Sequence, residues 1–68
     1  MRVSARNQLR GRVVSVKEGA VEAQVVVDVG GQEIVSVITV DAVKELGLTA
    51  GSDVVALIKA DSVMLAVE

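Results

Sequence analysis

The residues best suited to chemistry lie near the start of the chain, in the segment Ser4-Ala5-Arg6-Asn7. This segment offers a hydroxyl, a guanidinium group with five N–H donors, a side-chain amide and consecutive backbone N–H groups. The planar guanidinium fork suits two oxygens of an oxyanion, and the small Ala5 side chain lets an ion approach the backbone. The segment is therefore predicted to hold an anion rather than to transform one.

A second group of donors lies near the other end of the chain. Lys59 is the only basic residue after Lys44, and it is followed by Ala60-Asp61-Ser62, where free backbone N–H groups and a hydroxyl are expected. If the two segments meet, in one subunit or across an interface, they form a pocket of donors with net positive charge. The candidate oxyanion-binding residues are Ser4, Ala5, Arg6, Asn7, Lys59, Ala60 and Ser62.

The number of donors is sufficient for a useful affinity. A micromolar site needs about −8 kcal/mol, and each hydrogen bond to a charged group contributes roughly 1.5–3 kcal/mol, so about five bonds suffice. A plainer interpretation stays open, in which Ser4 and Asn7 cap a turn and Arg6 pairs with an acidic side chain.

The charge distribution favours a small anion over a polyanion. The chain carries seven basic and nine acidic residues, a net charge of −2, and residues 1–17 hold five of the basic residues and no acid. Nucleic-acid-binding barrels rely on aromatic stacking, and this chain has no Phe, Tyr or Trp. It also has no His or Cys, and no identifiable base accompanies Ser4 or Ser62, so neither an enzyme nor direct ligation of a metal is expected.

The elements that must position these donors are mostly strands. Strict alternation of apolar and polar residues predicts a strand over 21–29, and Val-rich or apolar runs between turn signals predict four more, over 9–17, 32–38, 53–59 and 63–67. One short helix is predicted over 39–46. A shift in parity near Val13-Val14 predicts a bulge, and Gly30-Gly31 predicts a tight hairpin. Thr39 is a suitable N-cap of the helix and Gly47 a suitable C′ residue. Residues 1–68 are thus expected to form one all-β domain with one short helix, a five-stranded barrel like the oligonucleotide-binding (OB) fold.

Composition predicts that this small domain assembles with copies of itself. Hydrophobic residues make up 51% of the chain, Val occurs 17 times, and the last two expected strands are apolar on both faces. A lone barrel covers only one face of such strands, so the other face is expected to meet a neighbouring subunit. No apolar segment is long enough for a membrane span or resembles a signal peptide, so a cytoplasmic location is expected.

The run Ser4-Ala5-Arg6-Asn7-Gln8-Leu9-Arg10-Gly11-Arg12-Val13 resembles the opening motif of the molybdate-binding Mop proteins, or molbindins, which are related to TOBE domains. The likeness continues through Ile38-Thr39, Glu45-Leu46-Gly47-Leu48 and Gly51 to Ile58-Lys59-Ala60-Asp61-Ser62-Val63-Met64. It therefore covers essentially the whole chain.

The resemblance implies an OB-like barrel assembled into a hexamer, a trimer of dimers, which holds molybdate or tungstate as an oxyanion at subunit interfaces and uses no organic cofactor. Ser4, Arg6 and Lys59 match ligand positions, and Ala5 and Asn7 match positions that supply backbone donors. Relatives often have Ser where this chain has Ala42 and Ala60, which implies loss of a hydroxyl contact with retention of the backbone N–H. The alternative function is an oligomerising structural or regulatory module with a weak or vestigial anion site.

Overall fold

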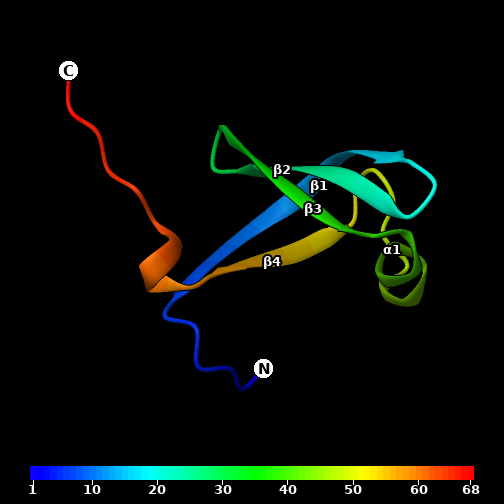
Figure 1. Cartoon of the computed structure of the whole chain (residues 1–68), viewed down its shortest axis with the longest axis horizontal. Coiled ribbons are helices and arrows are strands. Elements are labelled where there is room, and N and C mark those ends of the chain that lie inside the picture. Colours follow the sequence, from blue (N-terminus) through cyan, green and yellow to red (C-terminus); the bar gives the residue numbers. More distant parts are fainter.

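The computed structural model describes residues 1–68, and its main feature is one antiparallel sheet with the strand order β3-β2-β1-β4 (Figure 1). The elements in chain order are β1 (Asn7–Glu18), β2 (Glu22–Val29), β3 (Gln32–Thr39), α1 (Val40–Leu46), β4 (Asp53–Ile58) and a short 3₁₀ turn, η1 (Ala60–Ser62). The prediction of a mostly β chain with one short helix is confirmed. No helix is long and apolar enough to cross a membrane.

The prediction of five strands in a closed barrel is wrong for the single chain. The sheet has four strands, and β3 and β4 are its two open edges. Residues 63–67, predicted as the fifth strand, pair with nothing, because after η1 the chain leads away from its own sheet (Figure 1). High β-propensity cannot by itself make a strand where no backbone partner is within reach.

The long strand β1 joins the two halves of the sheet. Its first half, from Asn7 to Arg12, pairs with β4, and its second half, from Arg12 to Glu18, pairs with β2. The register shifts between Val13 and Ser15, which confirms the predicted bulge and lets one strand serve both neighbours.

The turns and the helix follow the sequence signals closely. Gly30 and Gly31 both have positive φ, and a carboxylate oxygen of Asp28 accepts the Gly31 N–H at 2.9 Å. The Thr39 hydroxyl caps α1, and Gly47 ends it in the left-handed conformation at φ 64°. The predicted hairpin and both helix caps are confirmed.

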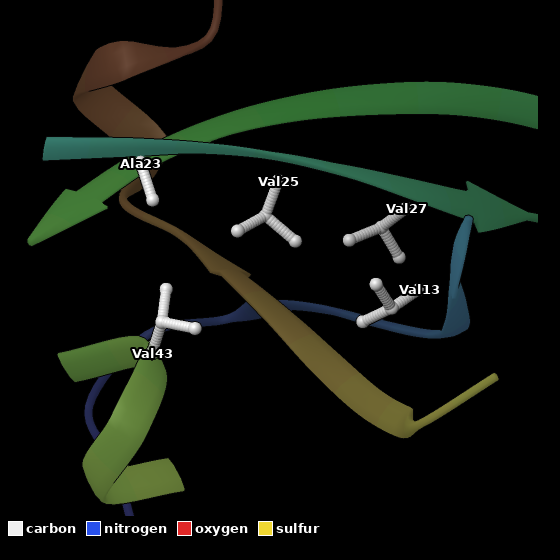
Figure 2. Packing of buried hydrophobic residues seen from close by; sticks show 5 residues of the cluster. All are labelled: Val13, Ala23, Val25, Val27 and Val43. Atoms are coloured by element: carbon white, nitrogen blue, oxygen red, sulfur yellow. The ribbon is translucent and has the colours of Figure 1, made fainter. Parts of the chain in front are cut away.

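The core is small for a chain so rich in apolar residues. Its five buried residues are Val13, Ala23, Val25, Val27 and Val43. Figure 2 shows Ala23, Val25 and Val27 in a row along β2, with Val13 of β1 and Val43 of α1 facing them. The remaining apolar side chains are half-buried or exposed, so the single chain leaves much of its apolar surface in contact with water.

Candidate oxyanion site

Strand pairing brings the two predicted donor segments to one place. Asn7, the first residue of β1, is paired with Ile58, the last residue of β4. The Asn7 side-chain amide also donates to the Ile58 carbonyl at 3.2 Å, which fastens the two strand ends together. Because antiparallel strands run in opposite directions, the residues before Asn7 and those after Ile58 emerge side by side, at the lower left of the sheet in Figure 1.

A shallow hollow of about 300 Å³ lies between these two segments. It is lined by Ser4, Ala5, Arg6, Lys59, Ala60 and Asp61. Five of the seven candidate residues therefore line one hollow within a single chain, although they are more than fifty positions apart in the sequence.

The other two candidates occupy different positions. Asn7 does not line the hollow, and its side-chain amide is engaged with the Ile58 carbonyl of β4. Ser62 is not part of the lining, and its hydroxyl lies 3.5 Å from a carboxylate oxygen of Asp61.

The donors in the hollow are largely unengaged. The Arg6 side chain makes no ion pair or hydrogen bond, and neither does the Ser4 hydroxyl. The Asn7 side chain bridges two strands instead of capping a turn. The alternative in which Arg6 pairs with an acid and the polar residues only cap a turn is therefore not what the structure shows. Gln8 donates to the Ala5 carbonyl at 2.9 Å, which engages one acceptor beside the hollow.

Asp61 lines the hollow but was not among the candidates. Its carboxylate lies 3.8 Å from the Lys59 ammonium, and the two side chains are 75% and 78% exposed. An exposed pair of this kind contributes at most about 1 kcal/mol, so an incoming anion can displace the carboxylate. The position of Asp61 could have been inferred from the sequence, because a turn directly after Lys59 brings the residue two positions later back towards the lysine side chain.

The fold and the donor cluster define the class of protein. The chain belongs to the TOBE domain family, whose profile matches residues 3–65. Within that family it is a Mop protein, as its relatives show. It is 51% identical over 69 residues to a probable molybdenum-pterin-binding protein of Haemophilus influenzae, and the match covers all of both chains. It is 47% identical to molybdenum-pterin-binding protein 1 of Clostridium pasteurianum, over 96% of this chain and 97% of that one.

Solved structures agree with this assignment. MopII from Clostridium pasteurianum superposes with a TM-score of 0.91 at 45% identity, covering 97% of this chain and 100% of that one. A molybdate-binding protein from Sporomusa ovata gives 0.92 at 39% identity, covering 97% and 98%. The cytoplasmic molybdate-binding protein ModG, in a molybdate-bound form, gives 0.85 at 44% identity, and the match spans 88% of this chain but 43% of that longer one.

Proposed function

We propose that this protein binds molybdate, and tungstate in the same way, through the donors that line the hollow between the start of β1 and η1. The observation that carries the proposal is the meeting of Ser4, Ala5 and Arg6 with Lys59 and Ala60 around one exposed hollow. Support comes from relatives of nearly full length whose names and titles describe binding of molybdate or of molybdenum-pterin.

The chemistry of the hollow matches a tetrahedral dianion. Such an ion is fully charged at neutral pH, so it needs hydrogen-bond donors and positive charge but no base. Arg6 supplies a two-pronged donor, Lys59 a point charge and Ser4 a hydroxyl. The backbone N–H groups of Ala5 and Ala60 supply further donors, while the Asn7 side chain ties the two strand ends together.

The exposure of the hollow supports a site shared between subunits. The Arg6, Lys59 and Asp61 side chains are exposed, so one chain covers only one side of an anion. A second subunit would supply the remaining donors and exclude water, which strengthens each hydrogen bond. We infer a homo-oligomer, a hexamer built as a trimer of dimers, that stores or buffers the oxyanion in the cytoplasm by binding and not by catalysis.

Equilibrium dialysis with molybdate tests the function. The expected result is saturable uptake that resists a large excess of sulfate or phosphate and is lost in the Arg6→Ala variant. Absence of saturable uptake by a stable oligomer would refute molybdate binding and support the alternative, a structural module with a vestigial site.

A further inference from the structure

The donors and the acceptors that line the hollow between the start of β1 and η1 differ in what they bind within the chain. The guanidinium group of Arg6 and the hydroxyl of Ser4 make no hydrogen bond, whereas the backbone carbonyl of Ala5 is engaged. It accepts a hydrogen bond from the side-chain amide of Gln8 at 2.9 Å. Ala5 is also the only half-buried residue of the six that line the hollow, so its polar groups have less access to water than those of the other five.

Two carbonyls on the η1 side of the hollow are engaged as well. The Lys59 carbonyl accepts the Ser62 N–H at 2.9 Å. The Ala60 carbonyl accepts the Val63 N–H at 3.4 Å. Both bonds belong to the 3₁₀ turn itself, so these two acceptors are in use without any ligand.

Asp61 supplies the one carboxylate of the lining, and it is paired too. The Lys59 ammonium lies 3.8 Å from one of its oxygens, and the Ser62 hydroxyl lies 3.5 Å from the other. A bound dianion attracts the lysine and repels the carboxylate, whose side chain is 75% exposed and free to turn into water. Asp61 therefore weakens the binding of every dianion by a similar factor and does not select among dianions of one charge.

Engaged acceptors matter for oxyanions that carry a proton. Molybdate, tungstate, sulfate and selenate carry none at neutral pH, so their oxygens only accept hydrogen bonds. Hydrogen phosphate and hydrogen arsenate are also tetrahedral dianions, but one of their oxygens is an O–H group that needs an acceptor. Where that acceptor is already in use, the O–H group is left without a partner, which lowers affinity by about 10-fold.

We propose that Gln8 is a positioning residue that makes the oxyanion site select ligands without a proton. By engaging the Ala5 carbonyl, Gln8 leaves the hollow rich in free donors and poor in free acceptors. Gln8 is not part of the lining and acts through Ala5, while the Ser4 hydroxyl, which can donate or accept, serves as a donor to the anion. This inference rests on the proposed function and names the class of ligand that the same site excludes, the protonated tetrahedral dianion.

Competition against molybdate in equilibrium dialysis tests the role of Gln8. The competitors form two pairs of similar shape, sulfate with phosphate and selenate with arsenate. At about pH 8.5 the phosphate is a dianion, so the members of a pair differ in the proton and not in charge. Gln8→Leu removes the donor at nearly constant volume, and Gln8→Lys keeps an N–H donor on a long side chain. Gln24→Leu is the matched control, at an exposed residue of β2 outside the hollow.

In the unmodified protein, the inhibition constants of phosphate and arsenate are expected to be about 10-fold higher than those of sulfate and selenate. In Gln8→Leu the freed Ala5 carbonyl accepts the ligand O–H, so this ratio should narrow by about 3- to 10-fold. Gln8→Lys and Gln24→Leu should keep the ratio of the unmodified protein. If Gln8 only stabilises the segment, Gln8→Leu weakens all four competitors equally and the ratio stays the same, which would overturn the proposal.

Asp61→Asn distinguishes the carboxylate from the Ala5 carbonyl as the acceptor that matters. We expect it to strengthen the binding of sulfate and phosphate by the same factor; a changed ratio would show that the carboxylate sets the preference and would overturn the assignment to Gln8 and Ala5.

The unmodified protein separates failure of this inference from failure of the proposed function. Equal competition within each pair would overturn selection by the proton while molybdate binding stands. Absence of saturable molybdate uptake would overturn the proposed function and this inference together.

Discussion

Replacement of Arg6 by Ala is the substitution that most sharply tests the donor hollow. Arg6 makes no ion pair or hydrogen bond in the free protein, so its removal should leave folding stability almost unchanged. In the proposed complex its fork would donate two hydrogen bonds to the anion, each worth roughly 1.5–3 kcal/mol, and partial exposure to water would reduce the net loss to about 2–3 kcal/mol. Because 1.4 kcal/mol is tenfold in affinity, Kd for molybdate should rise about 30- to 150-fold.

Two further variants distinguish the contribution of the planar guanidinium group of Arg6 from that of its positive charge. Arg6→Lys keeps the charge but loses the fork and should raise Kd only about 5- to 10-fold, since a point charge replaces paired donation. Arg12→Ala removes the same charge from the same end of the sequence. Arg12 lies six positions further along, about 20 Å away on an extended strand, where it forms an exposed ion pair with Asp53 at 3.4 Å.

Isothermal titration with molybdate at physiological salt measures all three variants. The Debye length there is about 8 Å, so Arg12→Ala should leave Kd within a factor of two. If Arg6→Ala and Arg12→Ala weaken binding equally, affinity depends on overall charge and the assignment of Arg6 to the site is refuted.

Three other substitutions test the site and the fold. Asp61→Asn removes the carboxylate that competes for Lys59 and should lower Kd for molybdate about 2- to 5-fold in titration, since an exposed ion pair is worth up to about 1 kcal/mol. Weaker binding would show that Asp61 helps to hold the ligand. Gly11→Ala would put a methyl group 2.5 Å from the Asp28 carbonyl oxygen and should cost about 1–3 kcal/mol in thermal unfolding, and an unchanged melting temperature would contradict the close approach of β1 to β2. Thr39→Ala removes the cap of α1 and should cost about 1 kcal/mol in the same assay with no change in Kd; a large loss of affinity would mean that α1 contributes to the site.

Local signals in the sequence predicted most of the elements. Alternation of apolar residues located β2, and Gly30-Gly31 located the turn to β3, because these patterns depend on neighbours only a few residues apart. The bulge after Val13 and both caps of α1 were predicted for the same reason. The strand prediction failed for residues 63–67, whose composition favours a strand but which have no partner strand within the chain.

The residues that line the candidate hollow could be picked out from the sequence, but their arrangement in space could not. Ser4, Arg6 and Lys59 were identifiable as donors, but their meeting depends on the register that places Asn7 opposite Ile58, which no local pattern specifies. Asp61 was missed because a search for donors passes over an acid, although this acid is the one that pairs with the lysine of the site.

The placement of the oxyanion site is tested most directly by NMR. Molybdate is titrated into the isotopically labelled, unmodified protein, and the shifts of the backbone amide signals report where the anion binds as well as whether it binds. Saturable shifts are expected that are largest for Ser4, Ala5, Arg6, Lys59 and Ala60, with little change at the Gly19-Ala20 turn between β1 and β2, at the opposite end of β1. Saturable shifts centred elsewhere, or none at all, would contradict the placement of the oxyanion site between the start of β1 and η1.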